Sequence, residues 1–188
     1  MVSLIVAILG VLAIVLNGIG MAIKDVIKTK ILLGSSIVLI IPDLYNSGGI
    51  HGVYQSAIIA TMYFIGALEY RKLERIILYS IPFFSVFLLL GLKEYEGLFL
   101  VLASISTPLA TISKDSFKMK LLLLVSTLSW GTYAILTQAW FALAFDILGA
   151  LALIYFFGQY RREKKAMQMI DTVCTEIEKT KDIFQKEN

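Results

Sequence analysis

The sequence predicts an all-α integral membrane protein with seven transmembrane helices in a 3+1+3 arrangement of parallel repeats, followed by a cytoplasmic C-terminal amphipathic helix. Three observations lead to this fold class: the composition, the distribution of basic residues and an internal repeat. Of the 188 residues, 58% are hydrophobic and 16% are charged, whereas a soluble domain keeps about a quarter of its residues charged. Most of the protein's surface is therefore expected to face lipid.

Charged residues divide the chain into seven apolar stretches of about the length that a helix needs to cross the hydrocarbon core. The expected spans cover residues 2–23, 27–45, 50–68, 76–92, 97–113, 121–138 and 140–160. The first stretch has no basic leader and is longer than the apolar region of a signal peptide, so we expect it to be retained as a span.

Basic residues lie almost entirely on one side of the predicted membrane. The loops after the first, third and fifth spans with the adjoining span ends, together with the tail, hold 16 of the 17 Lys and Arg residues, and Lys93 is the exception. Basic residues in short loops stay in the cytoplasm. The chain is therefore expected to be a multi-pass protein of the inner membrane, with its N-terminus outside and its C-terminus in the cytoplasm.

Two parts of the chain align without gaps when the sequence is shifted by 90 residues. Residues 24–30 (KDVIKTK) match residues 114–120 (KDSFKMK) at four of seven positions, and Tyr70-Arg71 matches Tyr160-Arg161. The alternative is that two cytoplasmic loops became basic independently. The offset predicts a repeat unit of three spans.

The predicted domain boundaries follow from this offset. The first three-helix repeat covers residues 1–70, a linking transmembrane helix covers 71–95, the second repeat covers 96–162 and the cytoplasmic helix covers 163–188. Because the linking helix restores the orientation of the second unit, the repeats run parallel and their pseudo-twofold axis lies along the membrane normal.

Several segments carry a resemblance to a known family. They are residues 10–13 (GVLA), the basic loop before Ile31, residues 124–130 (LVSTLSW) and Arg161-Arg162. In these segments the chain resembles the YgjV-type bacterial inner-membrane family, within the SWEET/PQ-loop-like transporter superfamily. The resemblance implies transport of a small solute.

The chain departs from the superfamily's pattern in the helices that would bind the solute. The second helix of a SWEET repeat often carries a Pro-Gln pair, where this chain has Pro42-Asp43 in the first repeat and Thr132-Tyr133 in the second. The third helix usually offers an Asn, where this chain has Gln55 and Asp146. These departures put specificity for sugars in doubt.

Polar residues within the apolar spans are the candidate solute-binding residues. Asp146 lies inside the seventh span, where an ionisable group is costly and faces a cavity or a partner; the alternative is a protonated carboxyl that bonds a neighbouring helix. Gln55 lies at the corresponding depth in the third span, and its alternative is an interhelical hydrogen bond.

The sixth and first spans supply further candidates. Ser126, Trp130 and Tyr133 share one helical stripe, which would line a solute path or serve helix packing. Asn17 shares a face with small residues and would touch the solute or act as a packing contact. Pro42 and Pro108 each remove a backbone hydrogen bond and are candidate hinges.

The favoured function is a transporter or facilitator of a small polar solute by alternating access between the two three-helix bundles. The runner-up is an oligomeric channel or effector, a homo-oligomer through residues 163–188, and an integral-membrane enzyme comes third because no catalytic constellation is visible. The expected partners are the lipid bilayer and the solute. With one His and one Cys, a metal site built from these residues is not expected, and no cofactor or nucleic-acid partner is predicted.

Overall fold

The computed structural model describes residues 4–47, 50–69, 72, 74–81, 83 and 96–186, without the side chains of residues 50, 51, 96, 97 and 173–186. Most of the predicted fourth span, including Pro82, lies outside the described residues. The side chain of Cys174 in the tail also lies outside them. The chain divides into two compact units, residues 1–153 and 154–188, which are described separately.

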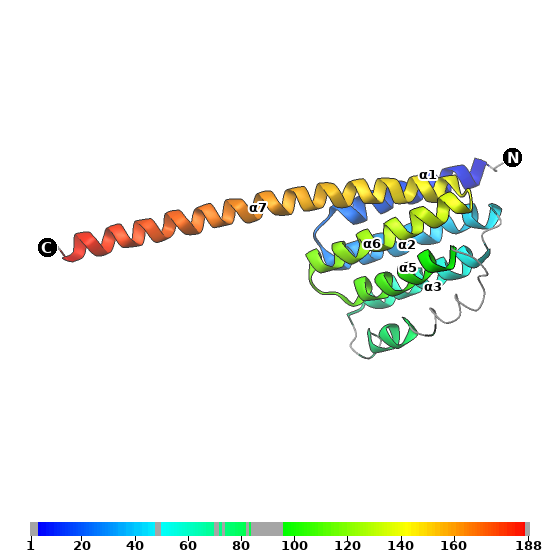
Figure 1. Ribbon diagram of the computed structural model, residues 1–188, viewed down its shortest axis with the longest axis horizontal. Coiled ribbons are helices and arrows are strands. Elements are labelled where there is room, and N and C mark those ends of the chain that lie inside the picture. The colour runs from blue at the N-terminus through cyan, green and yellow to red at the C-terminus, as the bar shows by residue number, and fades with distance from the viewer. Residues whose placement is uncertain are drawn as a thin grey trace. The chain divides into compact units, whose positions relative to one another are not determined.

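Every regular element in the described residues is a helix (Figure 1). The helices are α1 (Leu4–Ala22), α2 (Val26–Asn46), α3 (Ile50–Ala67), α5 (Glu96–Ile112), α6 (Ser116–Leu136) and α7 (Trp140–Lys186). Residues 74–81 are also helical. Within the first unit, α2 packs against α1 and α3, while α5 packs against α6 and α3.

Two aspartates begin equivalent helices. The Asp25 side chain accepts a hydrogen bond from the Lys28 backbone N–H at 2.9 Å, and Asp115 accepts from the N–H groups of Phe117 and Lys118 at 2.8 and 3.2 Å. Each carboxylate therefore satisfies backbone donors that have no partner within the first turn. The repeated Lys-Asp pair marks the start of α2 and of α6 because its aspartate is an N-cap.

The 90-residue offset recurs in the helix boundaries. α2 covers residues 26–46 and α6 covers 116–136, while α1 ends at residue 22 and α5 at residue 112. α3 begins at residue 50 and α7 at residue 140. The helix ends thus follow the same spacing as the charged sequence motif.

The first unit carries apolar residues outside and many polar residues inside. On α1, the exposed side chains Ile5, Ile8, Leu12 and Val15 form one helical face, as expected for a surface in contact with lipid. The interior of the bundle holds Asn17, Thr29, Lys30, Gln55 and Asp146, among other polar residues. This distribution fits a helical membrane protein.

Within the part of the chain that the structure describes, three helical segments are long and apolar enough to cross a membrane: Leu4–Ala22, Ser116–Leu136 and Trp140–Thr172. Gly52–Ala67 and Leu98–Ile112 are apolar but shorter. α2 covers the second predicted span, and it carries Lys28, Lys30 and Asp43 along its length. Length and composition thus support three of the predicted spans, and the full set of seven stays a prediction.

The last helix differs from the predicted boundary between a seventh span and a separate tail helix. α7 runs without interruption to Lys186, since no Pro or Gly follows Gly158 to break the helix where the composition becomes charged. In the second unit, the rings of Phe156 and Tyr160 stack with centroids 6.2 Å apart.

Candidate functional site

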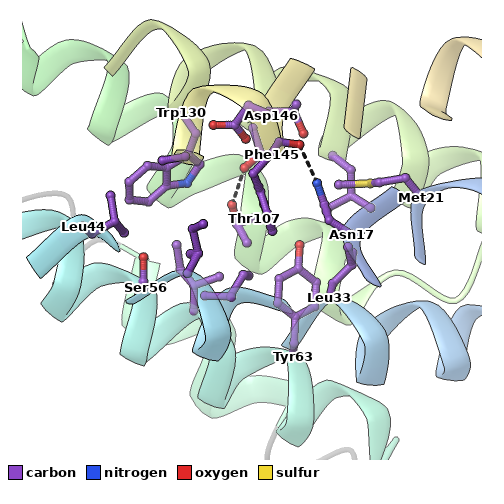
Figure 2. Close-up of a pocket in the computed structure, with 17 residues that line it drawn as sticks. Asn17, Met21, Leu33, Leu44, Ser56, Tyr63, Thr107, Trp130, Phe145 and Asp146 are labelled. Carbon is purple, nitrogen blue, oxygen red and sulfur yellow. Dashed lines mark hydrogen bonds between the residues drawn. The ribbon is translucent and has the colours of Figure 1, made fainter. Parts of the chain in front are cut away.

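A cavity lies among the helices of the first unit and receives residues from all six labelled helices (Figure 2). Its volume is about 60 Å³, which is room for a few water molecules. The wall is mainly apolar, and its polar or aromatic members are Asn17, Ser56, Tyr63, Thr107, Ser126, Thr127, Trp130, Phe145 and Asp146. An apolar pocket with a few convergent polar groups is the usual form of a small-molecule site.

Four of the six predicted solute-binding residues line this cavity: Asn17, Ser126, Trp130 and Asp146. Gln55 and Tyr133 are buried but are not among the residues of the wall. The structure therefore brings together candidates from α1, α6 and α7 and places the two others in neighbouring helix interfaces.

Gln55 joins α3 to α5. Its Nε2 donates to Ser104 Oγ at 2.6 Å, and the Ser104 hydroxyl donates in turn to Leu100 O at 2.6 Å. This is the interhelical hydrogen bond that the sequence offered as the alternative for Gln55. The next residue on α3, Ser56, reaches the cavity instead.

Tyr133 lies one turn further along α6 than Trp130, and the two rings meet edge to face with centroids 5.7 Å apart. Tyr133 packs with Leu100 of α5 in a small buried cluster, and its ring lies 3.5 Å from where a Cβ on Gly52 would be. Tyr133 thus supports the Trp130 side of the wall by packing behind it.

Asn17 links α1 to α7. Its Nδ2 donates to Phe145 O at 2.8 Å, and since that partner is an acceptor, the amide nitrogen must point toward it. The other amide atom, Oδ1, is buried with no hydrogen-bond partner in the described part of the chain. A Cβ on Gly149 would lie 2.8 Å from Nδ2, so the glycine permits this close approach of the two helices.

A hydroxyl pair joins α5 to α6 at the cavity. Thr107 Oγ1 and Ser126 Oγ are 2.6 Å apart and share a hydrogen bond, drawn as a dashed line in Figure 2. Thr107 directly precedes Pro108, one of the predicted hinges, and Pro108 lies inside α5 as Pro42 lies inside α2. A helical proline leaves a carbonyl one turn earlier without its usual donor; movement at either proline stays a prediction.

Asp146 is the one residue with a formal charge among the described residues of the wall. Its side chain is 9% exposed, and a Cβ on Gly131, next to Trp130, would lie 3.5 Å from Asp146 Cβ. The carboxyl group is therefore held near the Trp130 segment of α6. Within the described residues, no hydrogen bond or ion pair to this carboxyl group is present.

The wall itself follows the 90-residue offset. Five pairs of lining residues are separated by 90 positions: Asn17 and Thr107, Leu33 and Leu123, Ile37 and Thr127, Ile40 and Trp130, and Ser56 and Asp146. Equivalent positions of the two sequence halves thus face the same space. The partner of Asp146 in this register is Ser56, one residue after the predicted Gln55.

Sequence reasoning missed Ser56 and Tyr63 of α3, whose hydroxyl groups point into the space between the helices in Figure 2. They lie seven positions apart with Ile59 between them, which is the spacing of one helical stripe. The same stripe search that singled out Ser126 and Trp130 would have found them.

The burial of Lys30 and Lys120, the last lysines of the repeated motif, was not predicted from the sequence. Both side chains are fully buried. Lys30 Nζ donates to Gly66 O at 3.0 Å, and Lys120 Nζ donates to Gly20 O at 2.6 Å and to Thr29 Oγ1 at 3.1 Å. Gly66 and Gly20 lie in the last turns of α3 and α1, where carbonyl groups lack intrahelical donors. The lysines therefore cap the ends of neighbouring helices.

Comparison with known proteins agrees with the membrane character of the bundle. No curated protein and no solved structure matches the chain. A family described as "bacterial inner membrane protein" matches residues 4–166, a range that holds every residue that lines the cavity. The chain thus belongs to the Imp-YgjV family of bacterial inner membrane proteins.

Proposed function

We propose that the protein carries a small polar solute across the inner membrane by alternating access between two three-helix bundles, residues 1–70 and 96–162. The observation that carries this proposal is the set of five lining pairs at the 90-residue offset. Parallel repeats related by an axis along the membrane normal bring equivalent residues to that axis, and secondary transporters bind their solutes at such an interface.

The wall offers groups that can both hold and release a solute. Asn17, Ser56, Thr107, Ser126 and Asp146 supply hydrogen-bonding groups from five different helices. Because each group is on a separate helix, small movements of the helices change all the contacts together. Conduction and transport need binding that is strong enough for entry and weak enough for exit.

The orientation that we propose for the carrier rests on the charge asymmetry of the sequence. With the loop at residues 23–25 and that at 113–115 in the cytoplasm, the N-terminus is outside and residues 163–188 are cytoplasmic. The helix boundaries that recur at the 90-residue offset support the 3+1+3 arrangement, which is also that of the SWEET-like transporters that the sequence resembles.

Cysteine accessibility tests the transport proposal. In a Cys174→Ser background, Ser126→Cys places a thiol on the cavity wall, and Ser129→Cys places one at a buried position on the same helix outside the wall. In proteoliposomes with flux of a small polar solute, a water-soluble thiol reagent is expected to label Ser126→Cys and stop the flux. It should leave flux through Ser129→Cys unchanged.

Two results would count against the carrier. One is the absence of flux for every small polar solute tested in the wild type. The other is equal labelling of both cysteines, because the reagent would then reach the helix by a route other than the cavity.

A second candidate, an oligomeric channel or effector, is favoured by the surface of the second unit. Met167 and Ile170 lie three positions apart on α7 and are each 61% exposed. Exposed apolar side chains on one helical face favour a partner helix, and a second copy of residues 163–188 would supply it. Loss of oligomers on truncation after Arg162, measured by light scattering in detergent, would support this candidate, and an unchanged number of chains per particle would exclude it.

A further inference from the structure

The cavity wall is unbalanced in charge. Asp146 is its one carboxylate, and no Lys, Arg or His is among the described residues that line it. Lys30 and Lys120 are buried elsewhere in the bundle, on carbonyl groups of Gly66 and Gly20. An anionic solute would meet the Asp146 carboxylate with no compensating positive charge, which is unfavourable in a site of low dielectric constant.

A second residue of the cavity wall, Asn17, has an oxygen atom that accepts no hydrogen bond in the described residues. Asn17 is 1% exposed, its Nδ2 is committed to Phe145 O, and its Oδ1 has no partner in the described residues. Buried polar atoms without a protein partner are usually satisfied by water or a bound species. A solute rich in N–H groups supplies the donors that Asn17 and Asp146 lack.

The aromatic part of the wall fits the same chemistry. Trp130 lines the cavity. A Cβ placed on the next residue, Gly131, would lie 3.5 Å from Asp146 Cβ. Trp130 and Asp146 both line this cavity, so a cation within it is attracted by the charge of the carboxylate and, where it meets the face of the indole ring, by the negative potential of that face. A neutral solute gains neither contribution in full.

We propose that the solute of this site is a small organic cation that donates hydrogen bonds, with Asp146 as its counter-charge; this inference rests on the proposed transport function. The cavity of about 60 Å³ limits its size. At about 10–15 Å³ for each water-sized group, it accommodates roughly four to six non-hydrogen atoms. A monosaccharide is larger than this space.

Three solutes of equal size but different charge test the proposal: guanidinium, urea and acetate. Each has four non-hydrogen atoms, and guanidinium is a planar cation with donors alone. Titration calorimetry on the purified full chain, at millimolar concentrations far below those that unfold proteins, is expected to show binding of guanidinium and weaker or no binding of urea and acetate. Flux of the same solutes into proteoliposomes is then measured in parallel.

Asp146→Asn keeps the shape of the side chain and removes its charge. It should weaken guanidinium binding by roughly 10- to 100-fold, the equivalent of one charge-assisted hydrogen bond, and leave urea binding nearly unchanged. Asp43→Asn is the matched control, because Asp43 is 8% exposed and Asp146 is 9% exposed, but Asp43 is not part of the wall.

The outcomes separate this inference from the transport proposal. Binding of guanidinium that depends on Asp146, without flux, would support the cation site and overturn transport. Asp146-dependent flux of urea or acetate in preference to guanidinium would keep transport and overturn the cation. If Asp146→Asn does not fold, competition among the three solutes on the wild type decides alone, and equal or absent binding of guanidinium overturns the inference.

Discussion

Replacing Lys120 with Met removes a buried ammonium group while keeping an unbranched side chain of similar volume. In the wild type, Nζ donates to Gly20 O at 2.6 Å and to Thr29 Oγ1 at 3.1 Å. Gly20 lies in the last turn of α1, so its carbonyl group has no donor within the helix. The substitution therefore leaves a helix end of α1 without the cap that α6 provides.

The expected loss of stability follows from the unpaired carbonyl group. A buried acceptor left without a donor costs about 1–3 kcal/mol, and the relief from burying an ammonium group opposes any larger loss. In a protein of 150–250 residues, each kcal/mol lowers the melting temperature by about 2–4 °C, so Lys120→Met should lower it by roughly 2–12 °C.

Lys118→Met is the matched control. Lys118 lies two residues earlier on the same helix and is exposed. The free energy of unfolding of Lys118→Met should therefore lie within about 0.5 kcal/mol of the wild-type value. Thermal unfolding in detergent, followed by tryptophan fluorescence, measures both variants. If the two lysines act through their charge alone, as topology signals, the two variants will behave alike, and the capping role will have been refuted.

Two further predictions concern a helix contact and the topology. Gly149→Ala should destabilise the bundle by about 1–3 kcal/mol, because the new Cβ would lie 2.8 Å from Asn17 Nδ2. In the same unfolding assay, the control Gly18→Ala should be neutral or slightly stabilising, because its Cβ would meet open space. Equal loss of stability in the two variants would show that the contact with Asn17 is not the cause. A reporter fused after Arg162 should be cytoplasmic and one inserted after Ser47 should be external, and finding both on one side would end the seven-span prediction.

The helix positions were largely predictable because charged residues interrupt the apolar stretches. The predicted second span at residues 27–45 became α2 at Val26–Asn46, and the predicted fifth at 97–113 became α5 at Glu96–Ile112. The end of α7 was not predictable from hydropathy. A change from apolar to charged residues marks where a helix can leave lipid, but it does not by itself unwind the backbone.

The candidate site was predicted where polar residues are rare and missed where they are common. Asn17 and Asp146 stand out in apolar helices, and both line the cavity. Ser56 and Thr107 do not stand out, since hydroxyl groups can bond to their own helix and occur on every face. Gln55 lies at the depth in the bundle that the sequence predicted, but depth does not determine which way a side chain points. Its amide group bonds to Ser104 on α5 instead of facing the cavity.

The repeated motif shows where sequence symmetry stops predicting contacts. Lys30 and Lys120 occupy equivalent helix positions 90 residues apart, as the repeated motif predicts, and both side chains are fully buried, which the motif did not predict. Their Nζ atoms nevertheless bond to non-equivalent helices, α3 at Gly66 and α1 at Gly20. A flexible four-carbon stem lets the ammonium group reach a carbonyl group at the nearest helix end. The repeat therefore determines which residue is available to cap a helix, and the packing of the neighbouring helix ends determines which helix it caps.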